Sequence, residues 1–295
     1  MRNSRQATID DRELADQLNG PSGFPSVWAG LTKPVLTQFT SRPSVPFNES
    51  IFTPRIIEKT LSTINCSAPG PDGVSGRLLK SARLELSEVL SFLFSLFIAT
   101  GFVPSQWRFA NVTPIAKVDH PTQWSDYRPI SLCSNMSKAF EKVIARYIIN
   151  RTAGIWRNNK QHGFLPGKCT MDAVIKVMFD IGKAIDSKLS VISIFFDFAK
   201  AFDLVPHDLL LAKLDSLTLP DSPEKLMPQW LIKRIAAYLT DRQQRVRVNN
   251  IETAWTPVTA GVIHGSVLGP ILFLLYIADI NEYMPADVEF EKPMM

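Results

Sequence analysis

VISIFFDFAKAFD, residues 191–203, is the stretch that decides the fold, because an uncharged apolar run ends abruptly at Asp197 and a second carboxylate, Asp203, follows six residues later. The run 191–196 predicts a strand buried on both faces, and such a strand offers an ionised group a place only at its end. Asp197 therefore needs a partner. Two kinds of partner fit: a metal ion, which prefers oxygen ligands, or the following turn, which the carboxylate would cap.

Four further segments surround this stretch, and each combines turn residues, charges and apolar residues in a distinctive way. They read APGPDGVSGRLLK at 68–80, NVTPIAKVDHPTQWSDYRPISL at 111–132, QHGFLPGK at 161–168 and GVIHGSVLGPILFLLY at 261–276. Any one of them would match by chance, but five motifs in a fixed order are hard to obtain by accident. The succession, over residues 52–280, resembles the reverse transcriptases of non-LTR retrotransposons.

The resemblance implies an α+β fold, the right-hand arrangement of polymerases, with fingers, a partial palm and no thumb. It places a fingers-like region at residues 51–190 and the partial palm at 191–295, after a polar, Pro-rich and partly disordered linker at 1–50. The mixture of local patterns agrees, because expected strands neither alternate strictly with helices nor cluster in one block.

Local signals predict the individual elements. Thr53 and Pro54 form a helix start, and Gly101 with Pro104 forms a helix stop. Helices are expected from Pro54 to Cys66, from Ser75 to Gly101, and at 135–150, 170–185, 208–217 and 223–239; strands are expected at 111–118, 191–196, 244–248 and 254–262.

Composition narrows the class of protein. The chain of 295 residues is 45% hydrophobic and 20% charged, which is globular, and its net charge of +4 suits a polyanionic partner without proving one. The polar start lacks the apolar core of a secretory signal, and the most apolar stretch, 89–103, is shorter than a membrane span. We therefore expect an intracellular protein of the nucleus or cytoplasm, with no signal peptide and no membrane segment.

The three cysteines, Cys66, Cys133 and Cys169, are widely spaced and form no CxxC pair. This spacing predicts neither a disulfide framework nor a zinc site, and it favours a reducing compartment.

The chemistry that the resemblance implies is nucleotidyl transfer by two Mg²⁺ ions, with an RNA template, a DNA primer and deoxynucleotides as partners. It makes Asp197 the catalytic metal ligand, with Phe198 beside it at the nucleotide. Asp203 matches the second Asp of the same motif, and capping of a helix or loop is its expected role.

Three side chains are expected to hold the incoming nucleotide. The resemblance places Phe202 beneath the sugar, where an aromatic ring excludes a 2′ hydroxyl, although the residues alone fit a core Phe among 18 equally well. It places Lys117 and Arg128 on a hairpin that faces the triphosphate, and the two residues are the common phosphate-binding types. Without the resemblance, solvated surface charges would be the simpler interpretation of both.

The small residues of the last motif permit a close backbone approach. The resemblance assigns Gly265 to nucleotide binding and His264 and Ser266 to template positioning, whereas tight helix packing is the structural alternative. The family usually has Gln where His264 stands and Pro where Ile263 stands, which leaves template positioning open. Arg242, Arg245 and Arg247 alternate along an expected edge strand and fit either a nucleic-acid backbone or a solvated, charge-protected edge.

The family continues to a hairpin with the pattern [FY]xDD and then to a thumb, and we expect this chain to stop short of both, at VEFEKPMM. Its enzyme activity is therefore left open, because the second catalytic carboxylate motif is missing. Three hypotheses remain: a fragment of an RNA-directed DNA polymerase, a catalytically inactive remnant that binds nucleic acid without polymerising, or an unrelated scaffold whose motif matches are all accidental. The oligomeric state is not predicted.

Overall fold

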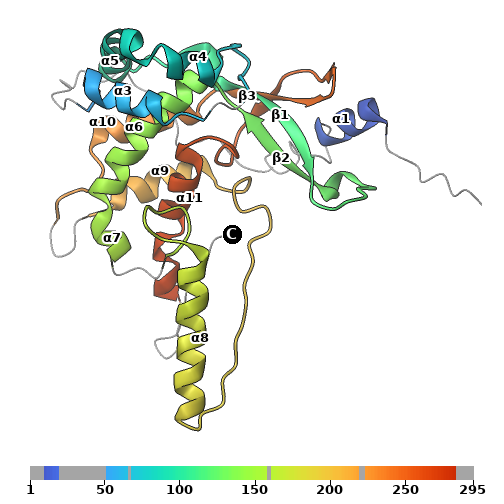
Figure 1. Ribbon diagram of the computed structural model, residues 1–295, viewed down its shortest axis with the longest axis vertical. Coiled ribbons are helices and arrows are strands. Elements are labelled where there is room, and N and C mark those ends of the chain that lie inside the picture. Colours follow the sequence, from blue (N-terminus) through green and yellow to red (C-terminus); the bar gives the residue numbers. More distant parts are fainter. Residues whose placement is uncertain (1–9, 20–50, 66–67, 158–160, 219–222, 284–295) are drawn as a thin grey trace, which may run out of the picture.

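The computed structural model describes residues 10–19, 51–65, 68–157, 161–218 and 223–283, and it combines helices with one mixed sheet (Figure 1). Its helices are α1 Asp11–Asn19, α3 Pro54–Ser62, α4 Gly76–Ser81, α5 Arg83–Thr100, α6 Asn135–Arg151, α7 Ala153–Arg157, α8 Thr170–Asp186, α9 His207–Ser216, α10 Gln229–Leu239 and α11 Leu268–Tyr276. Its strands are β1 Phe109–Ala116, β2 Tyr127–Leu132, β3 Arg242–Val248, β4 Ile251–Glu252 and β5 Thr256–Val258.

The sheet has the order β2-β1-β3-β4, with β5 also paired to β3. Strands β1 and β2 form an antiparallel hairpin, and β1 runs parallel to β3. The hairpin that carries Arg128 was expected, but its second strand, β2, was not among the strands that local signals predicted, and it contains Pro129. A proline cannot donate to a ladder, so it is tolerated at the edge position that β2 holds. Strand β3 lies inside the sheet, which corrects the expectation that its arginines line an edge.

Aromatic side chains form the centre of the helical part, where α3, α5 and α6 meet. The ring of Phe94 lies 5.7 Å from that of Phe52, 5.3 Å from that of Phe140 and 6.1 Å from that of Trp107, between ring centroids. All three contacts are edge-on, an arrangement that the ring quadrupoles favour. This cluster fixes α6 against the amino-terminal helices.

Helix boundaries follow the local signals closely. The Thr53 hydroxyl accepts the Ile56 amide at 3.3 Å and caps α3, and Gly101 closes α5 in the left-handed conformation at φ 76°. The second expected helix is divided at Ala82 into α4 and α5. Helix α3 ends at Ser62, and Cys66 lies outside the described residues.

The expected strand at 191–196 is not formed, and this prediction was wrong. The segment has no regular structure and is exposed, with Ile192 and Phe195 each 88% accessible. A strand exists only through backbone pairing with a neighbour, and within the described ranges no strand pairs with this segment. Helix α8 projects from the rest of the fold, and the chain returns beside it (Figure 1).

A short helix that we did not predict, α1, lies within the linker assigned to residues 1–50. It buries Leu14, Ala15 and Leu18 in a small cluster with Val246 of β3. The rest of that linker, apart from Asp10, lies outside the described residues, as does VEFEKPMM at the carboxyl end. No helix in the described ranges has the length and apolarity needed to cross a membrane.

Two cysteines can be compared with their prediction. Cys133 is buried, Cys169 is exposed, and both are free thiols. Burial raises the pKa of the Cys133 thiol to about 11, so it stays protonated and unreactive at neutral pH.

Candidate functional site

Two segments that are far apart in the sequence are joined by backbone hydrogen bonds at the centre of the molecule. The Val262 amide donates to the Phe202 carbonyl at 2.7 Å, and the Gly261 amide donates to the Val205 carbonyl at 2.8 Å. Gly261 has φ +87°, and a Cβ there would lie 2.9 Å from the Asp203 carbonyl oxygen. Only glycine therefore fits this position, which brings the 197–203 motif against the 261–266 loop.

The edge strand β2 holds the other side of the 261–266 loop. The Ser131 amide donates to the His264 carbonyl at 2.7 Å. Gly265 has φ +116°, and a Cβ on it would clash with the Ser131 carbonyl oxygen. The YRPISL strand, the 197–203 motif and the loop thus meet through main-chain contacts.

The side chain of Phe202 lies where these segments meet. Its ring stacks on the imidazole of His264 at 5.3 Å and an interplanar angle of 25°, and it lies 5.0 Å from the ring of Phe273 in α11. Phe164, from the QHGF segment, contacts it edge-on at 6.0 Å. Phe202 is half-buried, so part of the ring stays accessible.

A small cavity of about 40 Å³ lies behind the loop, lined by Ser131, Asp203, Arg242 and His264 among others. It has room for a few water molecules and is too small for a nucleotide. Burial raises the pKa of Asp203, while His264 and Lys200 lower it in part. Helix α9 begins after Pro206 without a side-chain cap, so Asp203 does not cap this helix, and its expected role in capping a loop stays a prediction.

His207 supports the loop from α9, and sequence reasoning missed it. Its Nε2 lies 2.8 Å from the Gly261 carbonyl oxygen, and the ring is buried. Burial lowers the pKa of His207, chiefly by desolvation, so the imidazole is neutral and donates this hydrogen bond. The only signal in the sequence was a histidine at the start of an expected helix.

The Ser266 side chain is buried and serves the loop itself. Its hydroxyl donates to the Ile263 carbonyl at 2.9 Å and accepts the Gly269 amide at 2.9 Å. These bonds give Ser266 a structural role, in which it closes the turn into α11.

Lys117 and Arg128 lie on the same face of the β1–β2 hairpin, both exposed. Arg128 is opposite Ile115, and the Lys117 amide continues the ladder by donating to the Asp126 carbonyl at 2.7 Å. The Lys117 ammonium donates to the Ser125 carbonyl at 2.9 Å. Lys200 of the 197–203 motif places its ammonium 5.4 Å from the centre of the Trp124 ring, which links the motif to the tip of this hairpin.

Asp197 and Phe198 lie at the margin of this arrangement. Phe198 is 43% exposed and contacts the Phe273 ring edge-on at 6.3 Å, while Asp197 is exposed. Across the described ranges, no group of three or more His, Cys, Asp or Glu side chains could hold a metal ion. The described residues therefore do not by themselves form a two-metal site, and Asp197 as a metal ligand stays a prediction.

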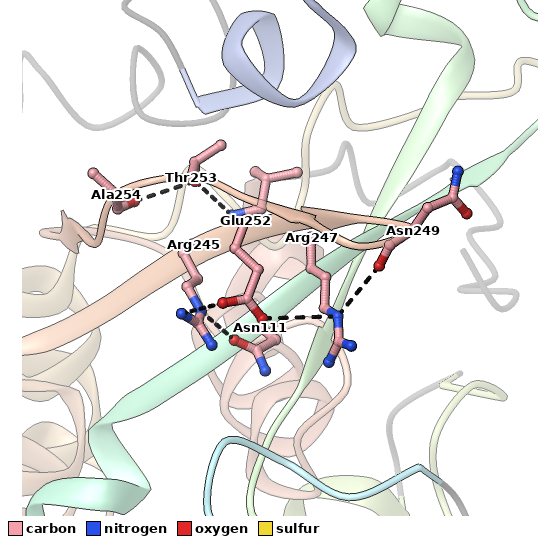
Figure 2. Close-up of polar contacts among 8 residues, drawn as sticks. Asn111, Arg245, Arg247, Asn249, Glu252, Thr253 and Ala254 are labelled. Carbon is pink, nitrogen blue, oxygen red and sulfur yellow. Dashed lines mark hydrogen bonds and ion pairs between the residues drawn. The ribbon is translucent and has the colours of Figure 1, made fainter. Parts of the chain in front are cut away.

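Two arginines of β3, Arg245 and Arg247, share a cluster of polar contacts on one face of the sheet (Figure 2). Arg245 pairs with Glu252 at 2.5 Å, donates to the Asn111 side chain at 2.8 Å and lies 4.6 Å from the centre of the Trp255 ring. Arg247 is 3.8 Å from the same carboxylate, and Arg242 is buried on the opposite face. Glu252 thus partly neutralises the charge of Arg245 and Arg247, so neither of the two expected roles of these arginines, an edge guard or a nucleic-acid contact, is needed to explain them.

Comparison with known proteins identifies the family. A family profile described as reverse transcriptase (RNA-dependent DNA polymerase) matches residues 115–290. Three similar proteins come from Drosophila melanogaster. The chain is 33% identical to "Probable RNA-directed DNA polymerase from transposon BS" over 79% of its own length and 25% of that protein. It is 31% identical to "Probable RNA-directed DNA polymerase from transposon X-element", over 77% of its own length and 24% of that protein. It is 28% identical to "RNA-directed DNA polymerase from mobile element jockey", again over 77% of its own length and 24% of that protein. The chain therefore spans about a quarter of the length of these curated relatives.

Proposed function

The chain belongs to the reverse transcriptase family, of the type found in non-LTR retrotransposons, and on this premise we propose that it selects the nucleotide and positions the template in RNA-directed DNA synthesis. The observation that carries the proposal is the stacking of Phe202 on His264 at 5.3 Å. This contact joins the motif that the family uses for the incoming sugar to the loop that it uses for the template.

Each neighbouring group has a defined part in this proposal. The accessible part of the Phe202 ring lies beneath the sugar and excludes a 2′ hydroxyl, with Phe198 packed beside it on Phe273. Gly265, which is exposed, lets the nucleotide approach the backbone, and His264 orients the template base. Lys117 and Arg128 bind the triphosphate from the hairpin face that they share.

The partners follow from this chemistry: an RNA template, a DNA primer and deoxynucleotides, met in the nucleus or cytoplasm. We assign residues 51–190 to the fingers and 191–295 to part of the palm.

Enzymes of this family use a divalent metal, and we propose Mg²⁺, with Asp197 as one ligand on the strength of its motif. The described residues do not complete such a site. The roles proposed above for the side chains are therefore limited to binding the nucleotide and the template and to discrimination by shape.

Binding of a fluorescent DNA primer annealed to an RNA template tests the proposal. The complementary deoxynucleotide should tighten primer–template binding more than the matching ribonucleotide does, because the Phe202 ring leaves no room for a 2′ hydroxyl. Phe202→Ala should abolish this preference. Phe92→Ala, at a Phe of α5 that is 67% exposed, is the control and should retain it. Equal responses to both nucleotides in the unaltered protein would contradict the proposal.

A further inference from the structure

The 261–266 loop is attached differently at its two ends. On the amino-terminal side it is held by main-chain hydrogen bonds to Phe202, Val205 and Ser131. On the carboxyl-terminal side it runs into α11, whose first amide groups need acceptors from elsewhere, because Val267 at the N-cap provides no side-chain cap.

A carboxylate from another helix supplies these acceptors. Glu141 of α6 accepts the Val267 amide at 2.8 Å and the Leu268 amide at 3.2 Å through Oε2, and it accepts the Ser137 hydroxyl at 2.8 Å through Oε1. Its side chain is buried, with the residue 1% exposed. A buried carboxylate is costly unless it is fully bonded, and here three donors and the positive end of α11 compensate for the lost water.

Glu141 is itself anchored to a rigid support. Ser134 caps α6 by accepting the Ser137 amide at 3.2 Å, and its hydroxyl donates to Asp72 at 2.5 Å. The Asn135 amide group donates to the Val74 carbonyl at 2.8 Å. The APGPDG segment therefore fixes the start of α6, and α6 presents Glu141 to α11.

We propose that Glu141 is a positioning residue: its carboxylate sets the place of the 261–266 loop, and with it the place of His264 over Phe202. That the position of His264 matters for the template rests on the proposed function. The hydrogen bonds between Glu141 and the amides at the start of α11 do not depend on it. A residue that only stabilised the fold would lower the free energy of global unfolding and speed exchange at the slowest amides of the core, whereas a positioning residue speeds exchange in the loop.

Amide hydrogen exchange of the whole 295-residue chain separates these roles. Glu141→Ala should speed exchange at residues 262–269 by about tenfold or more, because two amides lose their acceptor, and leave the slow amides of α5 unchanged. Glu141→Gln retains an acceptor oxygen and should restore most of the protection. Glu88→Gln, at an exposed position of α5, is the control and should leave the loop unchanged.

Uniform loss of protection throughout the chain, or an unchanged loop, would overturn the proposal. If Glu141→Ala does not fold, Glu141→Asp decides, because the shorter side chain cannot reach both amides and should still loosen the loop selectively. Primer–template binding is measured on the same proteins. Both proposals are supported if Glu141→Ala loosens the loop and also weakens template binding. If the unaltered protein binds no primer–template, the proposed function is overturned, and the exchange result alone tests the role of Glu141.

Discussion

Phe202 combines a packing role with an accessible face. Its ring contacts His264, Phe273 and Phe164, so two other motifs, 261–276 and 161–168, converge on one side chain. The interpretation of Phe202 as a core residue and its interpretation as a sugar contact are therefore compatible. The packed edge fixes the ring, and a fixed ring discriminates by shape better than a mobile one.

Arg128 is the side chain whose removal should affect nucleotide binding without affecting the fold. It is exposed on β2, and a charge-assisted contact to phosphate contributes about 1.5–3 kcal/mol, so Arg128→Ala should weaken nucleotide affinity about tenfold or more. The measurement is nucleotide titration of the primer–template complex. Arg55→Ala, at an exposed arginine of α3, is the matched control, and equal affinities of the two variants would refute the assignment.

His207 should make stability depend on pH. Burial lowers its pKa below the ordinary 6.5, so the neutral form is favoured on folding. This contribution is fully present above about pH 6.5 and is lost as the pH falls through the lowered value of the folded state. His207→Ala should reduce the free energy of unfolding by about 1–3 kcal/mol at neutral pH, because the Gly261 carbonyl loses its donor.

Urea unfolding at about pH 7.5 and about pH 5.5 measures both effects of His207. His207→Ala should lose less stability on acidification than the unaltered protein does. The exposed His120, changed to Ala, serves as the control and should behave like the unaltered protein. An identical pH dependence in all three proteins would show that His207 is not the titrating group.

The proximity of the motif residues could be predicted from the sequence, whereas supporting side chains that bond to distant backbone groups could not. Phe202 and His264 were expected at one site and their rings are in contact, while their roles toward a nucleotide and a template stay predictions. Glu141 and His207 were missed, because their partners are amides and a carbonyl more than 50 residues away. The one sign of Glu141 in the sequence was a charged residue on what the structure shows to be the buried, largely apolar face of α6.

At the scale of elements, the contact between the APGPDG segment and the start of α6 depends on Gly70. A Cβ at this position would lie 2.5 Å from the Ser134 amide nitrogen and 2.6 Å from the Cys133 carbonyl carbon. Both are backbone atoms, so Gly70→Ala should destabilise the protein by about 1–3 kcal/mol or more. Gly154→Ala, in α7 with nothing within 4 Å, should instead stabilise it by about 0.5–1 kcal/mol. Denaturant unfolding of both variants checks the pair, and similar midpoints would contradict it.

Elements that depend on local signals were predicted well, and elements that depend on distant partners were not. The Thr53 cap and the Gly101 stop are properties of neighbouring residues. Strand β2 was expected only through the resemblance, as part of the hairpin that carries Arg128, because its pairing with β1 leaves no local signal and Pro129 argues against a strand. The segment 191–196 has strand-forming residues, but no described strand pairs with it.

At the scale of the whole molecule, large apolar side chains are exposed on several of the described elements, including α5. Helix α8 exposes Met171, Ile175, Met178 and Phe179, and the segment 191–196 is exposed along its length. Unpaired apolar backbone of this kind associates with other chains. We expect association that increases with concentration in sedimentation velocity.

Two substitutions locate that association. The double variant Ile192→Lys and Phe195→Lys should reduce it strongly, because charges on an unpaired strand oppose pairing. Leu209→Lys, at an exposed Leu of α9, is the control and should have little effect. A monodisperse monomer at all concentrations, or equal effects of the two changes, would argue against the segment 191–196 as the contact.

Photo-crosslinking tests the central claim most directly, namely that the 261–266 loop faces the template base. A primer–template whose RNA carries 4-thiouridine at the first unpaired template position is bound to the chain and irradiated, and the crosslinked peptides are mapped. We predict a dominant crosslink in the peptide that contains His264, reduced when Glu141→Ala loosens the loop. Crosslinks scattered over the exposed basic residues, with none at 261–266, would contradict the claim.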